Sequence, residues 1–279
     1  MKSFNSIMLI LSPFMPLFFA AMGGILSERV GIINIALEGF LIISAFVAGV
    51  VYFYTSSIIL AILAGCASSG LAGLLHYFLT VKLRLNHIVS GLGINIFASG
   101  ITVYITSMLF DQSRSFQVGV KGSVLPVFLL IAAFVLITIS LFFNKTPIGL
   151  RYKAVGENPF DAKVLGIRVN NYRAIGLFAS GFITGIGGAF LVLQSGSFVK
   201  DIAAGRGYIA LAAVIFGNWK PLPAALGALI FAGFDWLGTS LQGRFLPDQI
   251  LRMLPYIITI IALAGIFKKA SPPAALGRI

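Results

Sequence analysis

The sequence predicts an all-α fold, a polytopic transmembrane helical bundle of about eight or nine spans. Hydrophobic residues make up 58% of the 279 residues, charged residues make up only 10%, and the mean hydropathy is +1.01. A soluble domain carries roughly 25% charged residues. Many of the apolar runs approach the ~20 residues that a helix needs to cross a bilayer. We therefore expect a single transmembrane domain over 1–279, with a cytoplasmic loop at 144–171.

Nine apolar runs separated by polar residues define the expected helices. They lie at about 7–26, 32–54, 57–80, 87–109, 124–143, 172–193, 207–217, 221–241 and 254–267. The first run is longer than a usual signal-peptide core and leads directly into another span, so we interpret it as a retained span. The run at 207–217 is too short to cross. We expect a broken or re-entrant helix there, which needs protein or a water-filled cavity to cover its exposed backbone.

Lysine and arginine residues predict how the bundle is oriented. With 144–171 in the cytoplasm and alternating runs, 13 basic residues face inward and 7 face outward, as the positive-inside rule requires. The inner set is Arg29, Lys82, Arg84, Lys145, Arg151, Lys153, Lys163, Arg168, Arg173, Lys220, Lys268, Lys269 and Arg278. The outer set is Lys2, Arg114, Lys121, Lys200, Arg206, Arg244 and Arg252. The C-terminus is then inside, and the N-terminus is outside if all nine runs cross; one re-entrant run reverses it.

The cytoplasmic loop contains start and stop signals for a short helix at 159–165. Asn158 suits an N-cap, and Pro159 suits the first helical position because its missing N–H has no partner there anyway. Asp161 places a negative charge in the first turn, and Gly166 is placed to end the helix. A helix of about two turns is marginal in water, so we expect it to dock on something.

The apolar residues of this short helix are candidates for a partner contact. Phe160, Val164 and Leu165 would insert into a groove on another protein, with Lys163 and Arg151 on the rim. The alternative is that the helix lies on the membrane surface or on its own bundle.

Four polar residues at apparent membrane depth are candidates for a translocation path: Asn34, Glu38, Asn95 and Asp235. A carboxylate inside a span is costly and indicates function by default. We expect Asn34 to lie one turn before Glu38 on the same helix face. The alternative for Glu38 is structural, with its carboxylate accepting N–H groups from the Glu28–Gly31 turn or pairing with Arg29.

Several function classes find no support in the residues. Cys66 is the single cysteine, and we interpret His76 and His87 as ordinary interfacial residues. We therefore expect no metal site and no cofactor. No GxxxxGK[ST] motif is present, so ATP binding by a P-loop is excluded. The basic residues are dispersed between apolar runs, which argues against nucleic-acid binding.

Four segments in order resemble the permeases of bacterial nucleoside ABC transporters, within the wider superfamily that serves ribose, galactose and branched-chain amino acids. They are SERVGIINIALEGF at 27–40, YKAVGENPFDAKVLGI at 152–167, GRGYIALAAVIFGNWKP at 205–221, and PYIITIIALAG with PPAALG within 255–277. The resemblance covers nearly the whole chain. Ala36 and Val30 are mild departures, where a glycine and a small residue are expected.

The resemblance implies a role for two of these segments. The coupling segment that receives the stroke of the ATPase would consist of Gly156, Glu157, Asn158, Pro159, Phe160 and Asp161. The segment near the translocation path would include Glu28, Arg29, Asn34, Glu38 and Gly39. The family assembles two different permeases, an ATP-binding cassette ATPase and an extracytoplasmic substrate-binding protein, a lipoprotein in many members. It resides in the bacterial cytoplasmic (inner) membrane.

The sequence therefore predicts a permease that imports nucleosides by alternating access and is not itself an enzyme, since a separate subunit would hydrolyse ATP. One alternative is an ABC permease for ribose or another monosaccharide, which ligand binding by the partner protein would reveal. Another is an ion-coupled secondary transporter, for which only Glu38 and Asp235 are available as intramembrane acids. A membrane-embedded enzyme has little support, because no catalytic set of residues is present.

Overall fold

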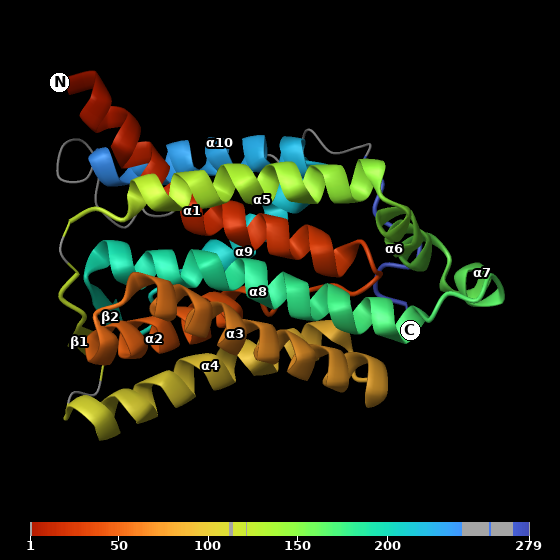
Figure 1. The fold of residues 1–279 in the computed structure, drawn as a ribbon, viewed down its shortest axis with the longest axis horizontal. Helices are drawn as coiled ribbons and strands as arrows, with labels where there is room; N and C mark the ends of the chain where they lie inside the picture. The colour runs from red at the N-terminus through yellow and green to blue at the C-terminus, as the bar shows by residue number, and fades with distance from the viewer. Residues whose placement is uncertain (1, 112–113, 121, 242–256, 258–269, 279) are drawn as a thin grey trace.

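The computed structural model describes residues 2–111, 114–120, 122–241, 257 and 270–278 (Figure 1). Within these residues, seven helices are long and apolar enough to cross a membrane, and they run side by side along the long axis of the molecule. The seven are α1 (Lys2–Glu28), α2 (Leu37–Thr55), α3 (Ile58–Tyr77), α4 (His87–Phe110), α5 (Leu125–Lys145), α8 (Val169–Ser195) and α10 (Pro221–Ser240). The predicted all-α bundle is confirmed; the span expected at 254–267 falls almost wholly outside the described residues.

Shorter elements connect these helices. They are the π-helical turn η1 (Phe78–Lys82), the helices α6 (Pro147–Glu157), α7 (Pro159–Val164) and α9 (Arg206–Phe216), and the strands β1 (Ser115–Gln117) and β2 (Ser197–Val199). The short helix expected at 207–217 is present as α9. The strands pair antiparallel, with Phe116 opposite Phe198. Strands of three residues are too short for a sequence pattern to predict.

The helices end at two opposite faces of the molecule. One end carries α6, α7 and the C-terminal residues, and the other carries β1, β2 and the start of α1 (Figure 1). Contacts hold the first end together: Arg29 Nη1 lies 3.9 Å from Glu157 Oε1, and Arg29 Nε donates to the Trp219 carbonyl at 2.9 Å. The α6–α7 end therefore carries loops whose lysine and arginine residues are predicted to face the cytoplasm. The strand end carries loops whose basic residues are predicted to face outward.

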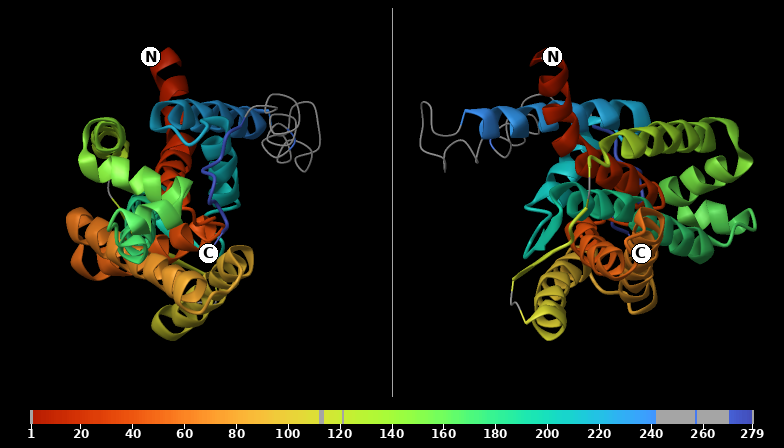
Figure 2. Two further views of the ribbon diagram at one scale, coloured as in Figure 1. Left: turned by 90° about the vertical axis from the view of Figure 1, so that its right-hand side faces the viewer. Right: turned by 60° about the vertical axis from the view of Figure 1, so that its left-hand side comes forward.

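α8 lies at the centre of the bundle and packs against α1, α2 and α3. In the two further views, α4 and α10 lie on opposite flanks of the molecule (Figure 2). The close approach depends on small residues: a Cβ atom on Gly181 would overlap the Ser69 carbonyl, and one on Gly185 would lie 2.8 Å from the Cα of Cys66. Ser69 Oγ also donates to the Gly181 carbonyl at 2.7 Å. The glycine spacing on α8 therefore serves helix packing.

The segment 29–36 between α1 and α2 is not helical, although it lies in the interior of the protein. Side chains satisfy its backbone. The Ile33 N–H donates to His87 Nδ1 at 3.2 Å, His76 Nε2 lies 3.2 Å from the Ile33 carbonyl, and Asn95 Nδ2 donates to the Ile35 carbonyl at 2.9 Å. Irregular backbone at this depth is tolerated because the protein itself supplies the partners.

This segment corrects two expectations. Asn34 and Glu38 do not share a helix face, because α2 begins at Leu37 and Asn34 lies in the irregular segment before it. The histidines lie at the ends of α3 and α4, as expected, but they are buried in the protein: His76 is 0% exposed and His87 is 4% exposed, and both bind the backbone of Ile33.

Candidate functional site

The loop between α5 and α8 projects from the end of the bundle and ends in α7 (Figure 1). Asn158 caps α7 as predicted: its Oδ1 accepts the N–H groups of Phe160 at 3.1 Å and Asp161 at 3.2 Å. Gly166 adopts a φ of 78°, a left-handed conformation that favours glycine, and so ends the turn after α7. The helix expected at 159–165 is confirmed at Pro159–Val164.

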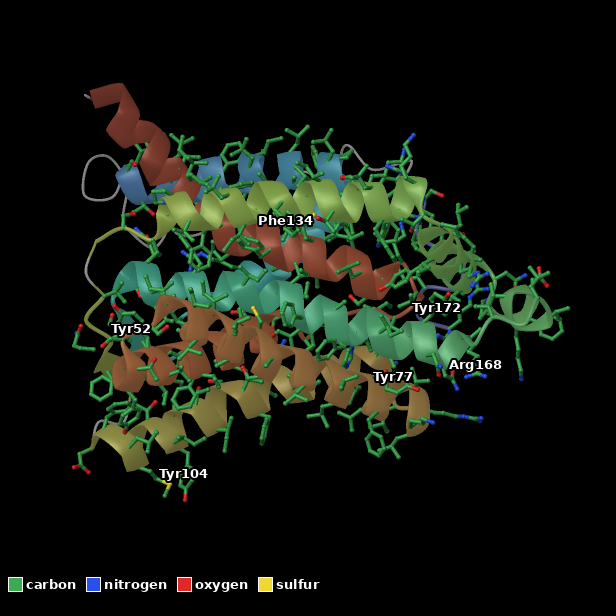
Figure 3. The ribbon with its side chains drawn as sticks, viewed as in Figure 1. Tyr52, Tyr77, Tyr104, Phe134, Arg168 and Tyr172 are labelled. Carbon is green, nitrogen blue, oxygen red and sulfur yellow. The ribbon has the colours of Figure 1, made fainter. Side chains whose placement is uncertain are left out.

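α7 presents three large apolar side chains to its surroundings. Phe160 is 74% exposed, Val164 73% and Leu165 76%. Exposed side chains on the flanks of the bundle, such as Tyr104 on α4 and Phe134 on α5, lie where lipid would cover them (Figure 3). α7 lies beyond the ends of the spanning helices (Figure 3), so its apolar surface suits a protein partner.

The end of α6 binds the turn that follows α1. A Cβ atom on Gly156 would overlap the Arg29 carbonyl, so only glycine allows this approach. Glu157 is half exposed; one of its oxygens pairs with Arg29 and the other accepts the Ala274 N–H at 3.1 Å. Burial lowers the pKa of the Arg29 guanidinium, and the charge of Glu157 opposes that shift. Gly156 and Glu157 therefore connect the predicted coupling segment, 156–161, to the bundle.

α6 was not predicted, because only one helix, at 159–165, was expected in this loop. Its signal repeats that of α7: Thr146 precedes Pro147, and Thr146 Oγ1 accepts the Gly149 N–H at 2.9 Å. On the inner face of α6, the Tyr152 hydroxyl donates to the Leu26 carbonyl at 2.5 Å. Burial raises the pKa of that hydroxyl, which stays protonated as the donor. α6 is thereby joined to α1.

Residues 270–278, the C-terminal strap, cross the same end of the molecule. The Ala275 N–H donates to the Gly156 carbonyl at 2.9 Å, and the Gly277 N–H donates to the Gly31 carbonyl at 2.9 Å. Arg173 on α8 donates to the Arg278 carbonyl at 3.1 Å. In the sequence, PPAALG contributed only to the family resemblance, and the contacts of the strap with Gly156 and Glu157 were not predicted.

Deeper in the bundle, Glu38 binds the start of α9. Its two oxygens accept the N–H groups of Gly205 and Gly207, each at 2.7 Å. The alternative interpretation of Glu38 predicted that its carboxylate accepts backbone N–H groups, and it does. The predicted partners, the Glu28–Gly31 turn and Arg29, are wrong, because the donors are Gly205 and Gly207. α9 begins against the first turn of α2, because Gly207 has no side chain to separate them. A carboxylate at a helix N-terminus is also favoured by the helix dipole.

The other three candidate path residues are divided between two places. Asn95 accepts the Gly39 N–H at 2.8 Å and donates to the Tyr208 hydroxyl at 3.0 Å, and so lies beside the start of α9. Asp235 pairs with Arg206, the first residue of α9, at 3.4 Å. Asn34 lies apart and donates to Ser180 Oγ on α8 at 2.9 Å. The structure thus brings Glu38, Asn95 and Asp235 together around the α9 N-terminus.

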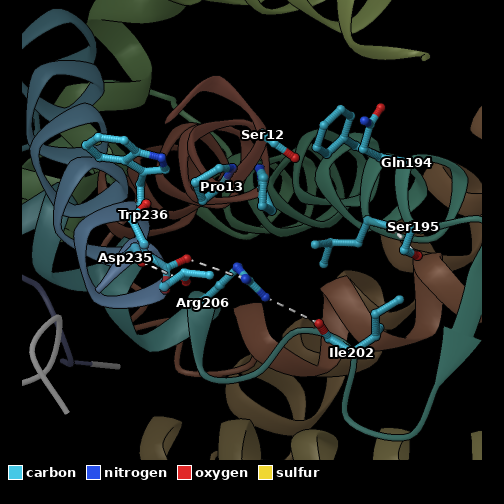
Figure 4. Close-up of a pocket in the computed structure, with 13 residues that line it drawn as sticks. Ser12, Pro13, Gln194, Ser195, Ile202, Arg206, Asp235 and Trp236 are labelled. Atoms are coloured by element: carbon cyan, nitrogen blue, oxygen red, sulfur yellow. Dashed lines mark hydrogen bonds and ion pairs between the residues drawn. The ribbon is translucent and has the colours of Figure 1, made fainter. Parts of the chain in front are cut away.

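A cavity of about 500 Å³ opens beside that N-terminus, between α1, α8, α9 and α10 (Figure 4). Of the four candidate path residues, Asp235 lines it. Gln194 and Ser195, at the end of α8, line it as well, together with Trp236. The arrangement can hold a small polar molecule with an aromatic face, since it combines charged, amide, hydroxyl and indole groups.

Comparison with known proteins places this architecture in a family. Residues 6–263 match the family described as "Branched-chain amino acid transport system / permease component". The nucleoside ABC transporter permease protein NupC of Lactococcus lactis is 39% identical, with 94% of this chain and 92% of that protein covered. The guanosine ABC transporter permease protein NupQ of Bacillus subtilis is 35% identical, with the same coverage of 94% and 92%.

More distant similarities define the fold. A putative glucose ABC transporter permease protein, TsgC13 of Haloferax volcanii, is 26% identical over 89% of this chain and 87% of its own length. PsaBC from Streptococcus pneumoniae in complex with Fab superposes with a TM-score of 0.54 at 16% identity, covering 91% of this chain and 89% of that chain. This chain belongs to the permease-component family of branched-chain amino acid transport systems.

Proposed function

We propose that this chain is the transmembrane permease of a nucleoside importer in the bacterial cytoplasmic membrane, driven by a separate ATP-binding cassette ATPase. The relatives named as nucleoside and guanosine permeases are 39% and 35% identical over nearly the full chain. The structural observation that carries the proposal is the exposed apolar surface of α7, beyond the ends of the spans. A second permease and an extracytoplasmic substrate-binding protein, a lipoprotein in many members, complete the transporter.

In this proposal, Gly156–Asp161 transmit the ATPase stroke to the bundle. The ATPase binds Phe160 and its apolar neighbours on α7. Movement then passes through Glu157 and Gly156 to Arg29 and the turn after α1, with the C-terminal strap tying these groups together. Because packed helices move as rigid bodies, displacement of this end changes which side of the membrane the central path faces.

The translocation path runs along the α9 N-terminus. Asn34, Glu38, Asn95 and Asp235 would contribute to it in different ways. Glu38 and Asn95 hold the broken backbone in place, because their polar groups bind the start of α9 and the start of α2. Asp235 lines the adjoining cavity. Discontinuous helices of this kind are frequent at transport sites.

A monosaccharide importer is the second candidate, favoured by the similarity to the putative glucose permease TsgC13 at 26% identity. The machine would be the same, and the ligand bound by the partner protein would distinguish the two.

The test of coupling is a pair of variants, Phe160→Ala and Phe134→Ala. Both side chains are at least 70% exposed, at 74% and 70%, but only Phe160 lies on α7. Loss of an aromatic anchor costs ~2 kcal/mol or more at a protein interface, a factor of about thirty in affinity. We expect Phe160→Ala to abolish most ATP-driven nucleoside uptake at an unchanged amount in the membrane. Equal uptake by both variants would contradict the coupling role.

A further inference from the structure

The cavity beside the α9 N-terminus gathers polar side chains from several helices at the strand end of the bundle. Figure 4 shows Asp235 and Trp236 from α10 on one side, Ser12 and Pro13 from α1 in the middle, and Gln194 at the end of α8 on the other. These residues come from three spanning helices. Polar and ionisable groups at membrane depth are costly, so their convergence on one cavity indicates a bound polar ligand.

α1 contributes backbone acceptors to this cavity. Pro13 and Pro16 both line it and both lie within the helix. A proline has no N–H, so Pro16 leaves the carbonyl of Ser12 without its intrahelical donor. In lipid such a carbonyl needs another partner. Ser12 itself lines the cavity and offers its hydroxyl at the same place.

Two donors at this cavity are buried and have no hydrogen-bond partner within the described part of the chain: Trp236 Nε1 and Arg206 Nε. Buried polar groups are normally hydrogen-bonded, so a ligand in this cavity would meet two donors that the described residues leave without an acceptor. Asp235 binds Arg206 Nη2 at 3.4 Å, and its carboxylate retains further lone pairs for hydroxyl donors.

The chemistry of the cavity suits a neutral aromatic ligand that carries hydroxyl groups. Its volume of about 500 Å³ falls within the range of ~300–1,000 Å³ typical of small-molecule sites. The charges of Asp235 and Arg206 cancel, and among the residues lining the cavity there is no second cation to neutralise a phosphate. The indole of Trp236 offers a face for stacking with a planar ring.

We propose that this cavity is a nucleoside subsite on the extracytoplasmic half of the permease, in which Trp236 stacks on the base and Asp235 accepts the ribose hydroxyls. The inference rests on the proposed function and deepens it, because it names the residues that contact substrate. Ser12 adds an acceptor for the edge of the base, and Trp236 Nε1, whose N–H lies in the plane of the indole, adds a donor for a ribose oxygen.

The test measures binding of radiolabelled guanosine to the detergent-solubilised transporter without its substrate-binding protein, which would otherwise bind nucleoside itself. We expect Trp236→Leu to weaken binding about ten-fold or more, and Trp236→Phe to weaken it less, because a phenyl ring still stacks. The matched control is Trp219→Phe, which changes the only other tryptophan of the chain. Trp219 binds Glu28 at the opposite end of the bundle, so guanosine affinity is expected to stay within two-fold.

A second readout keeps the proposal testable if the Trp236→Leu variant folds poorly. Guanosine should quench tryptophan fluorescence in the wild type and in Trp219→Phe but not in Trp236→Phe. We also expect Asp235→Asn to reduce the preference for guanosine over its 2′,3′-dideoxy form. Unchanged affinity in Trp236→Leu together with quenching retained in Trp236→Phe would overturn the subsite.

Uptake by the unmodified transporter separates this failure from failure of the proposed function. If the wild type imports nucleosides while the Trp236 variants bind guanosine normally, the subsite is wrong and the function stands. If the wild type neither imports nor binds nucleosides, both are wrong.

Discussion

Replacement of Glu38 tests the way α9 is held inside the bundle. Its two carboxylate oxygens each accept an N–H at 2.7 Å, from Gly205 and Gly207, and the side chain is buried. A hydrogen bond to a charged group contributes ~1.5–3 kcal/mol. Glu38→Gln keeps one acceptor and presents an NH₂ group to the other donor. We therefore expect this variant to lose ~1.5–3 kcal/mol of unfolding free energy. Glu38→Ala removes both hydrogen bonds and should lose ~3–6 kcal/mol of unfolding free energy.

The assay is thermal unfolding of the purified protein in detergent, followed by circular dichroism. At roughly 2 °C per kcal/mol for a chain of this size, Glu38→Gln should lower Tm by ~3–6 °C and Glu38→Ala by ~6–12 °C. The control is Asp111→Asn, because Asp111 is exposed at the end of α4 with a left-handed φ of 50° that asparagine adopts equally well. A Tm for Glu38→Ala equal to that of the control would refute the carboxylate clamp.

Three further changes test the packing and the coupling end. Gly181→Ala should destabilise the bundle by ~1–3 kcal/mol, because the added Cβ meets the Ser69 carbonyl. The control Gly100→Ala on α4 has open space around it and should leave stability unchanged. Equal Tm values for the two variants would exclude the close approach of α8 to α3. Tyr152→Phe leaves the Leu26 carbonyl without its hydroxyl donor and should cost ~1–3 kcal/mol in unfolding free energy, and an unchanged Tm would count against that bond. Glu157→Ala removes a half-exposed ion pair, so the unfolding free energy of the protein should fall by under ~1 kcal/mol. ATP-driven uptake should nevertheless fall several-fold. Unchanged uptake would exclude Glu157 from the coupling path.

The sequence was sufficient for features that depend on local chemistry. The apolar runs predicted the spanning helices, because crossing a bilayer fixes both their length and their composition. Asn158, Pro159 and Gly166 predicted α7, since capping and helix termination need particular residues at particular positions. The short run at 207–217 predicted a break, which the structure shows as α9.

Features that depend on contacts between distant residues could not be predicted. Glu38 stands out as a buried acid in the sequence, but its partners Gly205 and Gly207 lie more than 160 residues away along the chain. Residues 32–36 of the irregular segment were expected to continue the apolar run 32–54, and side chains of His76, His87 and Asn95 from other helices bind their open backbone. A periodic pattern records which face of a helix is apolar and carries no information on such long-range bonds.

We propose that this permease imports nucleosides with energy from an ATPase. The most direct measurement is uptake of radiolabelled nucleosides and ribose by cells with and without the gene, before and after collapse of the proton and sodium gradients. We expect that deletion abolishes nucleoside uptake alone and that uptake in the wild type survives gradient collapse while ATP is available. Loss of ribose uptake alone would move the chain to the sugar branch, and loss of uptake on gradient collapse would contradict ATP-driven transport.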